Sequence, residues 1–211
     1  MKNIKQIILG LFLILTVSLN AQNYSFFEND VRYDEHSTTV TLTHFGEFGI
    51  TQNFGFSDYV SVENNQLGVS YGQVLLGVNY KAIENVTFSI FAGKETLTNS
   101  LRMAAYTSYL NGDKLFVYAF YQKNPNETYD SEFYDLRLRY ATYSGNNNSV
   151  YVGVRYMRYY GVGLPIGLRQ TINDNCNLYV SYTTYYNAEV GQNYKDSSRW
   201  TPTFSLNLEL F

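Results

Sequence analysis

The sequence predicts an all-β protein, an antiparallel up-and-down barrel that crosses a membrane with about ten strands, although eight or twelve are also compatible. Three observations lead to this prediction. Apolar and polar residues alternate in segments of about ten residues, which is the period of a half-apolar β-strand. Short turn sequences such as Asn111-Gly112 separate many of these segments. The chain holds 22 Tyr and 14 Phe but only 3 Pro, and no second long apolar run follows the N-terminus, which excludes a helical membrane protein.

Residues 1–21 are predicted to be a signal peptide. Lys2 and Lys5 precede the apolar run 7–17, which is too short to cross a bilayer, and Ala21 is a suitable cleavage position. We therefore expect this segment to direct export and to be removed. Residues 22–37 show no clear pattern and are left unassigned, and the barrel domain is predicted to cover residues 38–211.

The charge balance and the cysteine count exclude several classes of function. The formal net charge is −3 at pH 7 with Lys2 and Lys5 included, which argues against a nucleic-acid partner. Cys176 is the single cysteine, so it cannot form an internal disulfide, and the sequence has no His/Cys spacing typical of a metal site. We expect neither a cofactor nor a metal.

The strands are predicted in order from Thr38, where the first one begins. Four hairpins follow, each made of two alternating segments and a short turn, at residues 75–93, 102–122, 135–160 and 164–186. The last strand is 203–211, in which every second residue is apolar. Longer polar connections are predicted at residues 51–65, 123–131 and 187–199.

The hairpin at residues 135–160 allows a test of strand register. The predicted pairs are Tyr143 with Ser149, Leu138 with Val154, and Arg137 with Arg155. In this register both strands agree on which face is apolar, and a shift of one residue would destroy the agreement.

Alternation alone does not say which face points outward, but three features favour an apolar exterior. The strands have about ten or more residues, enough to cross a bilayer when tilted, whereas soluble strands have about 5–6. Connections are short at one end and long at the other. Tyrosines such as Tyr80, Tyr121 and Tyr143 lie near strand ends, where an aromatic girdle would meet the head groups.

The signal sequence, the hairpins and the terminal segment NLELF (207–211) resemble those of the outer-membrane β-barrel proteins of Gram-negative bacteria. The resemblance covers nearly the whole exported chain, through pattern and not through a specific motif. It implies a location in the bacterial outer membrane, insertion by the barrel-assembly machinery, and long loops that face outward. One departure is that Ser205, Asn207 and Glu209 occupy positions that are often apolar in that family.

With the apolar face outward, a cluster of charged residues is predicted to face the lumen, together with Glu47. Its members are Glu95, Arg102, Asp135, Arg137, Arg139, Arg155, Arg169 and Glu209. In one interpretation the arginines pair with Glu95, Asp135 or Glu209 and fill the interior, which a barrel of about ten strands favours. In the other, they line a narrow path for small anionic solutes.

An enzymatic interpretation is weaker. His44 has the parity of the outward face, so we expect a bulge near Phe45-Gly46 or a shift of register there. His44, Glu47 and a serine are the residue types of a His–Ser–acid catalytic set, but no spacing in the sequence supports such a set. We therefore predict no catalytic residues.

The favoured functional interpretation is a filled barrel that acts as a structural or interaction component of the cell envelope. Its connections at 51–65, 123–131 and 187–199 would contact another envelope protein or a surface glycan. The arginine-lined channel is the first alternative, and a lipid-modifying barrel enzyme is the second.

Overall fold

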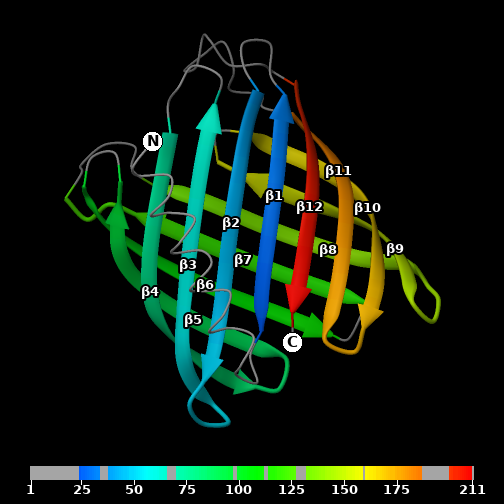
Figure 1. Cartoon of the computed structure of the whole chain (residues 1–211), viewed down its shortest axis with the longest axis horizontal. Helices are drawn as coiled ribbons and strands as arrows, with labels where there is room; N and C mark the ends of the chain where they lie inside the picture. Colours follow the sequence, from blue (N-terminus) through cyan, green and yellow to red (C-terminus); the bar gives the residue numbers. More distant parts are fainter. Residues whose placement is uncertain are drawn as a thin grey trace.

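The computed structural model describes residues 24–33, 38–65, 70–96, 99–111, 114–126, 132–158, 160–186 and 200–210. In these ranges the chain forms 12 antiparallel strands that close into one barrel, in which each strand pairs with its neighbours in sequence (Figure 1). The strands are β1 (Ser25–Tyr33), β2 (Thr38–Gly49), β3 (Phe54–Asn65), β4 (Ser70–Ile83), β5 (Val86–Glu95), β6 (Leu101–Asn111), β7 (Leu115–Lys123), β8 (Phe133–Ser144), β9 (Asn148–Met157), β10 (Gly161–Asn173), β11 (Cys176–Tyr186) and β12 (Trp200–Leu210).

The first and last strands close the barrel. In Figure 1, β1 lies beside β12, and their pairing runs from Ser25 with Leu210 to Arg32 with Thr203. Because every strand has two partners, the described sheet has no open edge. Among the described residues, no helix is long and apolar enough to cross a membrane.

The count of twelve strands corrects the predicted ten. β1 lies in the segment 22–37, which was unassigned, and β3 occupies most of the predicted connection 51–65. In β1 the inward positions are charged, at Glu28, Asp30 and Arg32, and Asn29 interrupts the outward apolar row, so the apolar period is weak. In β3 the outward row is interrupted by Asp58, which hides its alternation.

The outer wall of the barrel is apolar and the inner wall is largely polar. Leu76 and Leu164 are each 67% exposed on the outside, whereas the neighbouring inward positions Leu75 and Gly163 are buried. An apolar band of this kind is stable against lipid and unstable against water. The predicted outward direction of the apolar face is therefore confirmed.

The predicted register of the β8–β9 hairpin is correct over most of its length. Leu138 pairs with Val154 and Arg137 with Arg155, as predicted. Near the turn the register shifts by one residue, so that Tyr143 pairs with Val150 and not with Ser149. The extra residue is Thr142, whose hydroxyl donates a hydrogen bond to the Val150 carbonyl at 3.2 Å.

The two ends of the barrel differ in their connections. The terminal end, which holds Ser25 and Leu210, has only short connections between strands, at 50–53, 84–85, 112–114, 145–147 and 174–175. The opposite end, called the loop end below, includes the connections 124–132 and 187–199. The predicted asymmetry therefore holds for these two of the six connections at the loop end, since the other four have only three to five residues. Residues 127–131 and 187–199 themselves lie outside the described residues.

Candidate functional site

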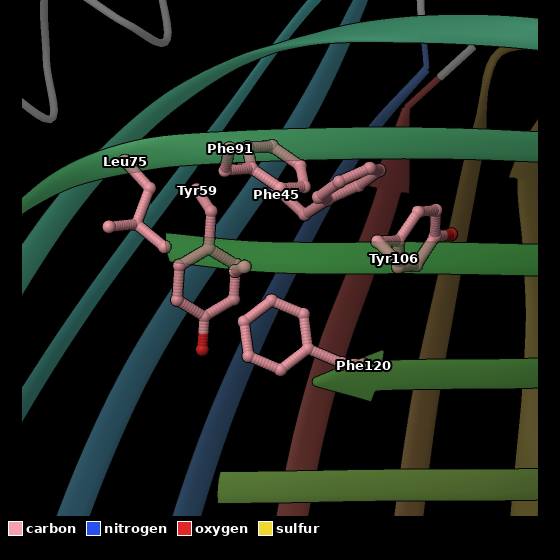
Figure 2. Close-up of a cluster of buried hydrophobic side chains, with 7 residues drawn as sticks. Phe45, Tyr59, Leu75, Phe91, Tyr106 and Phe120 are labelled. Atoms are coloured by element: carbon pink, nitrogen blue, oxygen red, sulfur yellow. The ribbon is translucent and has the colours of Figure 1, made fainter. Parts of the chain in front are cut away.

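The interior of the barrel has two unlike sides. Between β2 and β7 the inward side chains form an aromatic wall, made of Phe45, Tyr59, Phe91, Tyr106 and Phe120 (Figure 2). The ring centroids of Phe45 and Tyr106 lie 4.4 Å apart, and those of Tyr59 and Phe120 lie 4.9 Å apart in a stacked arrangement. On β1, β8, β9 and β12 the inward positions carry most of the charged groups.

A cavity of about 520 Å³ lies between these two sides. It extends from Arg32 and Tyr160 at the loop end to Tyr24 and Phe26 near the terminal end. A second cavity of about 40 Å³ lies nearer the terminal end, beside Arg169. The larger volume is typical of a small-molecule site, whereas the smaller one has room for only a few water molecules.

Arg137 on β8 crosses the lumen to β1. Its two terminal nitrogens donate to the two carboxylate oxygens of Glu28 at 2.8 and 2.7 Å. Since β1 and β8 are not neighbours in the sheet, this fork bridges the interior. Arg137 also donates to Asp135 on its own strand, at 3.0 Å through Nε and 2.6 Å through Nη2.

Arg155 on β9 joins the same network. It donates to the two oxygens of Asp135 at 3.0 and 2.8 Å, and to Glu28 and Asp30 at 3.3 Å each. Arg137 and Arg155 face each other in the β8–β9 ladder, and Asp135 receives hydrogen bonds from both. The like charges are therefore held together by shared carboxylates.

Arg139 lies between the two cavities and lines both of them. Its guanidinium group lies 4.6 Å from the ring centroid of Phe116, 5.2 Å from that of Tyr151 and 4.4 Å from that of Tyr179. It also pairs with Glu209 at 3.4 Å, and Tyr179 donates a hydrogen bond to the same carboxylate at 2.8 Å. Three rings and an ion pair thus hold this cation between the two cavities.

All eight residues of the predicted charged cluster lie on the inner face, but the structure divides them among several groups. Arg102 pairs with Glu95 near the loop end, where its Nε donates at 2.9 Å. Arg169 lies 5.8 Å from the ring centroid of Tyr179 near the terminal end. The remaining members belong to the network or to the Arg139 group described above, and they are Asp135, Arg137, Arg139, Arg155 and Glu209.

Sequence reasoning missed the charged residues that β1 contributes. Glu28 and Asp30 accept hydrogen bonds from the β8 and β9 arginines, and Arg32 lies 3.5 Å from Asp30 and 3.4 Å from Glu63. The spacing of Glu28, Asp30 and Arg32 at every second residue was the available signal. This spacing is typical of the polar face of a strand, but it was not sufficient to predict a barrel strand in this segment.

His44 lies on the outward parity, as predicted, but without the expected bulge. The pairings of β2 with β1 and with β3 continue through Phe45 and Gly46 with no shift. His44 Nδ1 lies 2.9 Å from Oδ2 of Asp58, which belongs to β3 and falls within the predicted connection 51–65. Glu47 points inward, so His44 and Glu47 do not form a site together. Over the described ranges, no three His, Cys, Asp or Glu side chains gather as metal ligands.

Comparison with known proteins shows the fold. No protein-family model matches the sequence, and no curated protein matches it either. Among solved structures, a KdgM porin is 14% identical, with 88% of this chain and 98% of that chain covered and a TM-score of 0.53. A NanC porin is 11% identical, with 89% and 99% covered and a TM-score of 0.57. A CymD monoaromatic hydrocarbon channel is 9% identical, with 92% and 90% covered and a TM-score of 0.56.

These similar structures are bacterial outer-membrane β-barrel proteins, and the chain described here has their fold. At such identities the likeness concerns the fold alone. The resemblance inferred from the sequence pattern is therefore confirmed at the level of architecture.

Proposed function

We propose that this protein is a small channel of the bacterial outer membrane that passes small polar solutes. The observation that carries the proposal is the cavity of about 520 Å³, which follows the lumen from the loop end to Arg139. Support also comes from the similar structures, which are described as porins or as a channel. This support favours the channel over a purely structural role.

The narrow point of the proposed path is Arg139 with its three rings. The cavity on the loop side and the small cavity on the terminal side both end at this group. A solute would pass only when the guanidinium group moves aside from Tyr179 or leaves Glu209. The resting structure therefore resembles the filled barrel expected from the sequence, and the proposed channel is narrow.

The arginines alone pointed to selectivity for anions, but the lining is balanced. Five carboxylates and five guanidinium groups line the larger cavity. The carboxylates are Glu28, Asp30, Glu63, Glu132 and Asp135, and the guanidinium groups are those of Arg32, Arg102, Arg137, Arg139 and Arg155. Small anions can contact Arg139, but the lining carries equal numbers of acidic and basic groups. Its net charge therefore does not favour the passage of anions over that of neutral or dipolar solutes.

Replacing Arg139 with alanine should widen the path and raise the size limit for solutes. The change removes a charged side chain that lines both cavities and lies among Phe116, Tyr151 and Tyr179. The measurement is the swelling of liposomes that contain the refolded chain, in solutions of sugars of increasing size. Arg158→Ala is the matched control, because Arg158 lies beyond the end of β9 and lines neither cavity. An unchanged size limit in an inserted Arg139→Ala barrel would contradict this narrow point.

The proposed location also predicts the start of the exported chain. We expect protein recovered from the outer membrane to begin at Gln22, because cleavage after Ala21 removes the basic and apolar segment. N-terminal sequencing of that material tests this. Recovery of a chain that still carries Lys2 and Lys5 would contradict it.

We also propose contact with another envelope protein or a surface glycan through the connections 123–131 and 187–199. The predicted connection 51–65 is left out of this proposal because most of it is strand β3.

A further inference from the structure

The charged network and the aromatic wall meet at one place in the lumen. The guanidinium group of Arg137 lies 4.8 Å from the ring centroid of Tyr118, and the Tyr118 and Tyr106 centroids lie 5.2 Å apart. Tyr106 in turn contacts Phe45 at 4.4 Å. A molecule in the larger cavity can therefore touch paired charges on one side and flat apolar rings on the other.

The network is arranged so that neither sign of charge is left over. Glu28 accepts hydrogen bonds from both terminal nitrogens of Arg137, and Asp135 accepts hydrogen bonds from Arg137 and Arg155. An incoming anion that paired with Arg137 would leave Glu28 beside Asp30 and Asp135 without its main cationic partner. An incoming cation that paired with Glu28 would leave the like charges of Arg137 and Arg155 close together without that carboxylate.

A molecule that carries both charges avoids this difficulty. Its carboxylate can replace Glu28 at Arg137 while its ammonium group replaces Arg137 at Glu28, so both sides of the broken pair regain a partner. If it also carries a flat apolar group, that group can lie against Phe45 and Tyr106 of the aromatic wall and against the adjoining ring of Tyr118. The volume of about 520 Å³ suits a molecule of this size.

We infer that the lumen binds small zwitterions with an aromatic or similarly flat side group, such as an aromatic amino acid or a dipeptide that contains one. This inference names the solute class of the proposed channel and rests on it for transport, but binding can be measured separately. Recognition would use opposite charges across the Glu28–Arg137 bridge and the rings of the aromatic wall.

Four probes separate the contributions of charge and ring. L-phenylalanine carries both charges and a ring, N-acetyl-L-phenylalanine only the carboxylate, L-phenylalanine amide only the ammonium group, and glycine both charges without a ring. Isothermal titration with the refolded mature chain in detergent should give binding of L-phenylalanine at least tenfold tighter than that of any other probe. Equal binding of the N-acetyl compound would overturn the inference in favour of a simple anion site. Equal binding of glycine, or no binding at all, would overturn it as well.

Two variants test whether the named residues make this distinction. Glu28→Gln removes a negative charge and should shift the preference toward the N-acetyl compound, whereas Arg137→Gln should shift it toward the amide. Opposite shifts cannot arise from a general loss of folding. If one variant does not fold, the other still decides, because an unchanged ratio of affinities in it would contradict the inference. Tyr106→Leu, which removes the ring that lies against Phe45 and Tyr118, should weaken binding of L-phenylalanine without changing that of glycine.

Flux of labelled L-phenylalanine into liposomes distinguishes the two proposals. Tight binding with no flux above that of empty liposomes would contradict the channel while the binding inference stands. Flux of ions and sugars with no preference for the zwitterion would contradict the inference while the channel stands.

Discussion

The Leu138→Arg variant should fail to insert into membranes. Leu138 points outward from the middle of β8, is 46% exposed and pairs with Val154 on the apolar wall. A cation that faces lipid near the midplane costs about 2–4 kcal/mol. This is a large part of the stability of a typical protein, which is about 5–15 kcal/mol. The fraction of chain that resists protease after refolding into lipid vesicles measures the effect.

The matched control for this variant is Tyr143→Arg. Tyr143 also points outward from β8 but lies one residue from the end of the strand, next to the short connection to β9. At that depth the cost of a cation falls to about 0–1 kcal/mol, so the control should insert. Normal insertion of Leu138→Arg would show that this wall does not face lipid.

The Arg137→Ala variant should lower the free energy of unfolding by about 3–5 kcal/mol, because it leaves buried carboxylates without their cation. Glu28 is 5% exposed, and Arg137 supplies its bidentate partner across the lumen. Asp135 would also lose one of its two cations, although Arg155 remains. Urea unfolding of the barrel in lipid vesicles provides the measurement.

A double variant separates lost packing from unpaired charge. In Arg137→Met with Glu28→Gln, the carboxylate that the single variant leaves unpaired is also removed, so stability should recover in part. If Arg137→Ala unfolds at the same urea concentration as the natural chain, the cross-lumen bridge does not stabilise the barrel. Water in the lumen would then satisfy Glu28.

Much of the architecture could be predicted because the pattern of a barrel strand is local. In β8 and β9 the alternation of Leu138 and Val154 with Arg137 and Arg155 was sufficient to give the direction of the faces and most of the register. The shift at Thr142 was missed because a bulge leaves no change in the alternation on the partner strand. β1 and β3 were missed because a polar residue interrupts the outward apolar row of each strand, Asn29 in β1 and Asp58 in β3.

The candidate site was harder to predict, since its contacts join residues far apart in the sequence. Glu28 and Arg137 are separated by 109 positions, and no local pattern connects them. The alternation of residues along β8 and β9 predicted that Arg137, Arg139 and Arg155 point inward. It could not predict the partners of these arginines on β1. The contact of His44 with Asp58 could not be predicted for the same reason, because Asp58 lies on β3, which the sequence did not identify as a strand.

Single-channel recording of the refolded mature chain in a planar bilayer distinguishes a conducting channel from a filled barrel. We expect discrete, salt-dependent openings whose size changes in Arg137→Ala and Arg155→Ala, because both side chains line the larger cavity. A correctly inserted barrel that stays silent over many recordings would contradict the channel. The arginines would then be filling for a closed barrel, and its function would have to be sought at the loop end.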